Sequence, residues 1–223
     1  GVNGGPEDVV IFCGSGASGA VNKMIDILNL RLPADLDARY DLASRIPAEQ
    51  RPVIFIGPYE HHSNELPWRE TIADVVMIDE DRDGRIDEAH LERELNAYRD
   101  RPLKIGSFSA ASNVTGIVSN IRPLTILLHR SGALAFWDFA AAAPYVAIEM
   151  NLAVGDLADL ARADAGVGQL QLQFRQALRD GSQSLDAVRL ADVHREKGGI
   201  GALVTGQIAA RQHADQVFVI DHR

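Results

Sequence analysis

The sequence lacks several features that would assign the chain to a specialised class. It has a single cysteine, Cys13, so no intrachain disulfide can form, which fits a reducing, cytoplasmic location. No apolar run is long enough to span a bilayer, and no basic-then-apolar signal peptide opens the chain. The formal net charge of -9 argues against nucleic acid and anionic membranes as partners.

What remains is a chain of 223 residues that can bury one substantial core, or one domain with an appendage. Gly1 stands where an initiator methionine would be, so we expect upstream sequence to be missing. Strand patterns alternate with helical patterns, which predicts an α/β fold, a mainly parallel sheet with helices on both faces. The expected strands are "DVVIFC", "PVIFIG", "ADVVMID", "LKIGSFS" and "ALAFWDF".

The helices between these strands include "DEAHLERELNAYR" and "IRPLTILLHR". For the second, Asn120 is the expected cap, Pro123 lies in the first turn and Gly132 follows the end. After about Ala165 the rhythm weakens into helix with polar breaks, so we expect two parts, residues 1–164 and 165–223. The late stretch "QVFVID" could form an edge strand.

The first expected strand leads into a glycine-rich turn and an amphipathic helix, "GSGASGAVNKMIDIL". Its glycines spell G-x-G-x-x-G, a pattern that places phosphate at a helix N-terminus in dinucleotide-binding proteins. That site also needs an acid closing the second strand. Asp35 and Asp37 lie at a suitable distance but in a helical pattern, so a nucleotide-dependent oxidoreductase is a weak alternative. A glycine turn without a ligand is a stronger rival.

The segment from Asp79 to His90, "DEDRDGRIDEAH", matches much of a calcium-binding loop. Its twelfth position, normally a bidentate glutamate, is His90, and imidazole is a poor ligand for a hard cation. A strand pattern precedes it where a calcium loop has a helix. We therefore predict no metal site, and an acidic strand-to-helix turn with Asp87 at the next helix N-terminus.

Three further stretches follow the ends of expected strands: "GPYEHHSNELPWRE", "GSFSAASNVTGIVS" and "LAFWDFAAAAPYV". In an open parallel sheet, ligands bind at the carboxyl ends of the strands, so these turns should converge near the glycine loop. Together with the glycine loop they provide a phosphate-binding turn, an imidazole, an amide and a carboxylate.

This set, in this order, resembles the class V aminotransferase family of fold-type I pyridoxal-phosphate enzymes, which includes cysteine desulfurases and selenocysteine lyases. The similarity runs from about Asp8 to about Asp164, with a weaker echo at "HREKGGIGAL". The resemblance implies the large-domain fold of those enzymes, pyridoxal phosphate as cofactor, an amino-acid substrate and a homodimer.

The resemblance also implies roles for individual residues. Ala17 would bind the cofactor phosphate through its backbone N–H, and Ser18 through its hydroxyl. His61 matches the histidine that stacks over the cofactor ring, and Asn113 the residue near its phenolic oxygen. Asp138 matches the aspartate that pairs with the pyridine nitrogen, which keeps the ring an electron sink. His61 and Asp138 are the expected catalytic residues.

Two departures from the family pattern affect the expected activity. Ala141 stands where many members have glutamine, which removes one hydrogen bond to the cofactor. The lysine that binds the cofactor covalently is also missing, because the matching run "LADLARADAGVGQLQLQF" contains none. Lys23, Lys104 and Lys197 all lie elsewhere, so the chain resembles a truncated or internally deleted member. Inactivity in this form is therefore one expectation, and a non-catalytic remnant or interaction module is the alternative.

Cys13 ends the first expected strand, whereas the sulfur-accepting cysteine of desulfurases lies in a late loop that this chain does not reach. A small buried thiol is the favoured interpretation.

Overall fold

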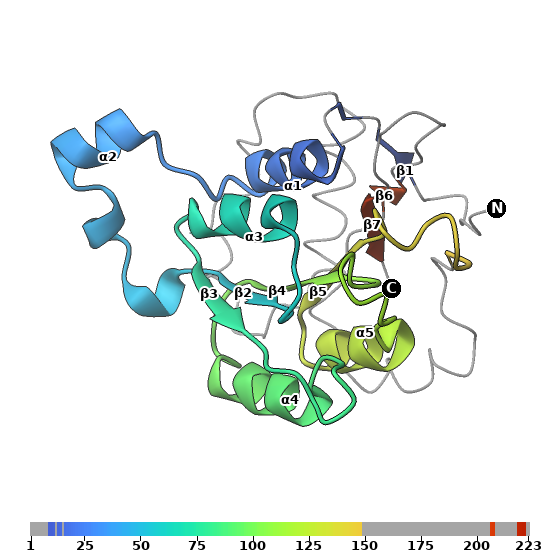
Figure 1. The fold of residues 1–223 in the computed structure, drawn as a ribbon. Helices are drawn as coiled ribbons and strands as arrows, with labels where there is room; N and C mark the ends of the chain where they lie inside the picture. Colours follow the sequence, from blue (N-terminus) through green and yellow to red (C-terminus); the bar gives the residue numbers. More distant parts are fainter. Residues whose placement is uncertain (1–8, 12, 15, 149–205, 208–217, 222–223) are drawn as a thin grey trace.

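The computed structural model describes residues 9–11, 13–14, 16–148, 206–207 and 218–221. Its strands form one sheet in the order β1-β6-β7-β5-β4-β2-β3, with helices on both faces (Figure 1). β2, β3, β4 and β5 pair in parallel, and β7 is antiparallel to its neighbours β5 and β6. The predicted α/β class and mainly parallel sheet are confirmed.

The bounds of the elements agree with most of the predicted pattern. The strands are β1 (Val9–Val10), β2 (Val53–Ile56), β3 (Asp74–Met77), β4 (Lys104–Ser109), β5 (Leu134–Asp138), β6 (Gly206–Gln207) and β7 (Phe218–Asp221). The helices are α1 (Gly16–Ile27), α2 (Ala34–Tyr40), α3 (His62–Arg69), α4 (Glu88–Ala97) and α5 (Ile121–Arg130), with short 3-10 turns at Ala43–Arg45 and Ala48–Gln50.

The sheet separates two apolar cores, one on each face. Alternate side chains of a strand point to opposite faces. Ile54 and Phe136 pack with α1 and α3, while Phe55 and Trp137 pack on the other side with α4 and α5. Because both faces are covered, β2 and β5 are buried along their whole length and read as continuous apolar runs.

Close packing of α5 against the sheet depends on a glycine in β4. A Cβ at Gly106 would lie 2.6 Å from Cδ1 of Leu128 and 2.7 Å from Cε2 of Phe108. Gly132 ends the α5 turn with φ 65°, as a residue past a helix C-terminus commonly does. Asn120 does precede α5, but its side chain makes no cap hydrogen bond and donates to Glu88 instead, at 3.1 Å.

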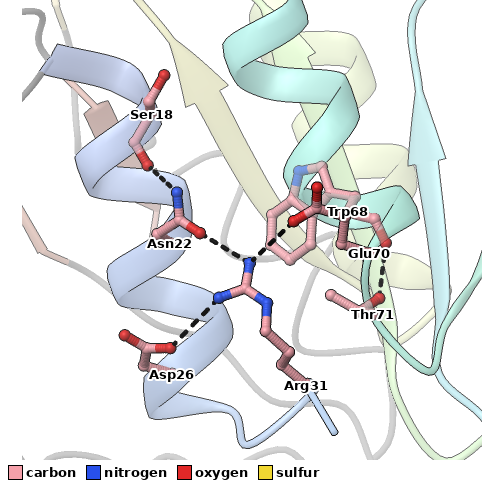
Figure 2. A network of polar contacts seen from close by, with 7 residues as sticks. All are labelled: Ser18, Asn22, Asp26, Arg31, Trp68, Glu70 and Thr71. Carbon is pink, nitrogen blue, oxygen red and sulfur yellow. Dashed lines mark hydrogen bonds and ion pairs between the residues drawn. The ribbon is translucent and has the colours of Figure 1, made fainter. Parts of the chain in front are cut away.

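On the other face, α1 is tied to the segment after α3 by Arg31 (Figure 2). The Arg31 guanidinium donates to Oδ1 of Asn22 at 2.7 Å and lies 3.9 Å from the Glu70 carboxylate. Asn22 in turn donates to the backbone carbonyl of Ser18 at 2.8 Å. This chain of polar contacts connects the first turn of α1 to its far end and to the α3 side.

Three differences between the sequence analysis and the described structure need comment. The last four residues of "QVFVID", Phe218–Asp221, form β7 inside the sheet, between β5 and β6, so the edge position was wrong. Helix α3 was not predicted, because Pro67 interrupts its hydrogen bonding and two histidines open it. The boundary between residues 164 and 165 lies outside the described residues.

Within the described part of the chain, no helix has the length and apolar character to cross a membrane.

Candidate functional site

Asp138 ends β5 as a buried carboxylate on the sheet face that carries α1 and α3. It is 4% exposed, and Oδ1 accepts a hydrogen bond from the backbone N–H of Ala140 at 2.8 Å. Burial raises the pKa of Asp138, while the Ala140 N–H and the nearby His61 oppose that rise. A buried carboxylate with so little compensation is suited to a cationic N–H partner.

His61 immediately precedes α3, at the carboxyl edge of β2. Its side chain caps the helix, since Nδ1 accepts from the backbone N–H of Ser63 at 3.2 Å and lies 2.8 Å from Ser63 Oγ. The ring is exposed but close enough to Asp138 to affect its pKa. The structure therefore brings together two of the predicted site residues, from segments far apart in the sequence.

The glycine-rich turn leads into α1 on the same face of the sheet. Gly16 adopts φ 64°, a conformation that favours glycine. A Cβ at Gly19 would lie 1.7 Å from the carbonyl oxygen of Gly14, so only glycine fits there. Ala17 is buried and Ser18 half-buried in the first turn of α1. Helix α1 begins at the edge where β5 ends, as the βα connections of a parallel sheet require.

Asn113 lies in an exposed turn after β4. Two of the chain's lysines, Lys23 and Lys104, lie within the described residues. Lys23 is exposed on α1, and Lys104 opens β4 at the opposite edge, where its ammonium donates to the carbonyl of Arg99 at 3.0 Å. Burial lowers the pKa of Lys104. Lys197, the lysine-free run beyond Leu157 and the segment "HREKGGIGAL" lie outside the described residues.

Sequence reasoning missed a polar network centred on Glu60, half-buried at Glu60 and Ser109 and fully buried at Asn64 and Ser107. Its Oε1 accepts from the backbone N–H of Ser109 at 2.8 Å, and Oε2 accepts from Ser109 Oγ at 2.7 Å and from Asn64 Nδ2 at 2.6 Å. The network continues inward, as Ser107 Oγ donates to Asn64 Oδ1 at 2.6 Å and accepts from Trp68 Nε1 at 3.0 Å. One signal was available: Ser107 and Ser109 alternate within a strand that is otherwise buried.

Glu60 is a strongly perturbed acid. Burial raises its pKa from 4.5 to about 7, and the nearby Asp138 adds to the rise. The hydrogen bonds from Ser109 and Asn64 oppose it. A small hollow beside Glu60 is lined by Tyr59, Arg85 and Ser112, among others.

The loop that resembles a calcium site has other uses for its acids. Asp87 caps α4, with Oδ1 accepting from the N–H groups of Ala89 at 2.9 Å and His90 at 3.0 Å. Asp81 Oδ1 accepts from Asp83 N–H and Arg85 N–H in a tight turn. This is the acidic strand-to-helix turn that was predicted.

Comparison with known proteins agrees with the geometry. A model of the family "Aminotransferase class-V" matches residues 41–158, more than half of the chain. A probable cysteine desulfurase of Halalkalibacterium halodurans is 30% identical over 102 residues, which are 44% of this chain and 24% of that protein. Probable cysteine desulfurase 2 of Mycobacterium leprae is 29% identical over 153 residues, 66% of this chain and 34% of that protein.

Among solved structures, a NifS-like protein from Rickettsia africae is 19% identical with a TM-score of 0.40, over 63% of this chain and 44% of that one. Mouse CSAD is 18% identical with a TM-score of 0.43, over 59% and 27%. These two similarities are too weak to add to the fold described above. The chain spans only about a quarter to a third of the length of the curated relatives it matches. On the match of the family model to more than half of its residues, the chain belongs to the class V aminotransferase family.

Proposed function

We propose that this chain is the cofactor-binding part of a pyridoxal-phosphate-dependent, cysteine desulfurase-like protein that acts on an amino acid. One observation supports this most strongly. The buried carboxylate of Asp138 lies at the carboxyl end of β5, close to the exposed ring of His61, on the face where α1 begins. Ligands of parallel sheets bind at that edge.

The residues present fit this cofactor. Asp138 would pair with the protonated pyridine nitrogen, an N–H cation that would stabilise its buried charge. His61 would stack on the ring, because its free edge and face are exposed while Nδ1 is held by Ser63. Ala17 and Ser18, in the first turn of α1, would bind the phosphate, and the positive end of the helix dipole favours that charge. Asn113, in the exposed turn after β4, would approach the phenolic oxygen.

The bound cofactor would supply an electron sink for the α carbon of an amino acid. The chain's own residues would bind and orient it, and Asp138 would hold a proton at the ring nitrogen. Moving a proton at the substrate needs a base, which lysine provides in the family. Lys23 and Lys104 are poorly placed for that task. We infer that this form binds the cofactor reversibly and does not turn over substrate.

The missing lysine also favours a second candidate, a non-catalytic remnant that binds the cofactor weakly or serves as an interaction module. Homodimerisation and a cytoplasmic location belong to the first proposal through the family resemblance. The two candidates differ in how strongly Asp138 and His61 contribute to cofactor affinity.

The test is to titrate pyridoxal phosphate into the full chain, following the quenching of tryptophan fluorescence and checking the stoichiometry by ultrafiltration. Asp138→Asn keeps the shape but removes the charge, so affinity should fall about tenfold or more, as expected for loss of a charge-assisted hydrogen bond. Asp35→Asn, on the exposed first turn of α2, is the matched control and should leave affinity unchanged. Equal affinity for the wild type and Asp138→Asn would refute the proposed cofactor site.

A further inference from the structure

The loop between β2 and α3 is folded around the side chain of Glu60. A Cβ at Gly57 would come 2.7 Å from Oε1 of Glu60, so the glycine leaves room for the carboxylate to turn back beneath the loop. In that position Glu60 meets the end of β4 and the first turn of α3.

Both oxygens of Glu60 are held by directed donors. Ser109 contributes its backbone N–H and its hydroxyl, and Asn64 contributes its amide. The orientation of that amide is fixed from the other side, because Asn64 Oδ1 accepts from the hydroxyl of Ser107. The amide nitrogen must therefore face Glu60. The carboxylate is clamped between β4 and α3.

His61 follows Glu60 directly and has extended backbone, with φ -66° and ψ 148°. Among the residues that the structure describes, its ring has one polar anchor, at Ser63, the residue preceding Asn64. The position of the His61 ring therefore depends on the path of residues 57–61 and on the first turn of α3. Glu60 fastens both to the strand whose last residue, Ser109, pairs with Asp138.

We propose that Glu60 is a positioning residue that holds His61 over the site edge beside Asp138. The proposal rests on the proposed function for the use made of His61, but the placement of the ring can be measured without any cofactor. Because the Ser63 N–H donates to Nδ1, neutral His61 should carry its proton on Nε2 alone. If Glu60 no longer holds the loop, the ring should exchange between both tautomers.

The experiment measures the ¹⁵N chemical shifts of the His61 ring in the cofactor-free full chain, at a pH well above histidine titration, with His61→Asn giving the assignment. The wild type should show one tautomer, and Glu60→Gln an average of two, because an amide donor would face the donors of Ser109 and Asn64. Glu70→Gln, whose side chain is 72% exposed, is the matched control and should match the wild type. A single Nε2–H tautomer in folded Glu60→Gln would overturn the proposal.

Ser109→Ala provides a second variant, because it removes the hydroxyl contact to Glu60 and keeps the backbone one. It should shift the tautomer balance in the same direction by a smaller amount, and it decides the matter if Glu60→Gln does not fold. An unchanged His61 signal in Ser109→Ala would then count against the proposal.

Pyridoxal phosphate affinity should also fall about tenfold in Glu60→Gln, equivalent to the loss of one hydrogen bond to a charged group. If the wild type binds no cofactor, the proposed function fails while the tautomer result still stands.

Discussion

Ser109 and Asp138 are register partners at the ends of β4 and β5, and Ser109 donates both its backbone N–H and its hydroxyl to Glu60. Two acids, Glu60 and Asp138, are thereby held on either side of one serine at the carboxyl edge of the sheet. Burial raises the pKa of both acids, so each holds its proton to a higher pH in the folded chain than in the unfolded one. The first prediction concerns the consequence for stability.

We expect the free energy of unfolding to fall as pH rises from about 4.5 to about 7, in part because of Glu60. The folded chain holds the Glu60 proton up to about pH 7, whereas the unfolded chain releases it near 4.5, so deprotonation favours unfolding across that interval. The full shift corresponds to a loss on the order of 3 kcal/mol. Urea denaturation at a series of pH values measures it.

Glu60→Gln should flatten this pH dependence, since glutamine does not titrate. Asp138→Asn should flatten it separately, because the raised pKa of Asp138 acts in the same direction. A stability profile in Glu60→Gln with the same slope as the wild type would show that Glu60 ionises freely in the folded chain.

Gly19→Ala should disrupt the turn before α1. The new Cβ would collide with the carbonyl of Gly14, so the backbone must move, at a cost of about 1–3 kcal/mol. Affinity for pyridoxal phosphate should fall with it. Gly14→Ala is the control, because its Cβ would enter open space. Equal stability and affinity of the two variants, by thermal melts and fluorescence titration, would contradict the described turn.

Ser107→Ala should destabilise the fold by about 1–3 kcal/mol, because the buried Asn64 carbonyl and Trp68 indole N–H each lose their shorter hydrogen bond and keep only the 3.4 Å contact with each other. Ser44→Ala, whose hydroxyl bonds locally at the exposed end of the α2 segment, should change stability much less. Chemical denaturation compares them. A Ser107→Ala chain as stable as the wild type would mean that the polar network adds nothing to the core.

Borohydride reduction of the chain mixed with pyridoxal phosphate should give no stoichiometric pyridoxyl-lysine adduct. A covalent bond needs an unprotonated amine held beside the cofactor aldehyde, whereas Lys23 is exposed on α1 and Lys104 is bonded to the Arg99 carbonyl at the start of β4. Peptide mass mapping after reduction is the measurement. A full adduct on Lys197, lost in Lys197→Ala and accompanied by amino-acid turnover, would instead show a rearranged enzyme.

The sequence predicted the parts of the fold that depend on local pattern. Buried strands such as β2 and β5 are continuous apolar runs, and their order along the chain implied parallel pairing. The position of β7 depends on which strand it meets across the sheet, a long-range contact that its own residues do not encode. Helix α3 was hidden because Pro67 is unfavourable inside a helix, and packing of Trp68 between the sheet and α1 overrides that preference.

The candidate site shows the same division. Asp138 and His61 were found through the resemblance to class V aminotransferases, in stretches at or just beyond the ends of recognisable strands, and the structure does bring them close. Their roles towards a cofactor stay predictions. Glu60 was passed over because an acid in a turn looks like a solvated residue, and only the fold reveals that Ser109, from a strand far along the chain, meets it.

The two cores on opposite faces of the sheet are assembled from different lengths of chain. The core beneath β2, β4 and β5 uses α4 and α5, which lie between those strands in sequence, whereas the core above them also needs α1, which precedes β2 by the α2 segment. Short loops close with a smaller entropy loss than long ones, so local βα units should form early. We expect α1, with its glycine turn, to dock after α4 and α5. Pulsed hydrogen exchange would then protect α5 amides before those of α1, and the glycine turn would acquire its shape after the core formed by α4 and α5.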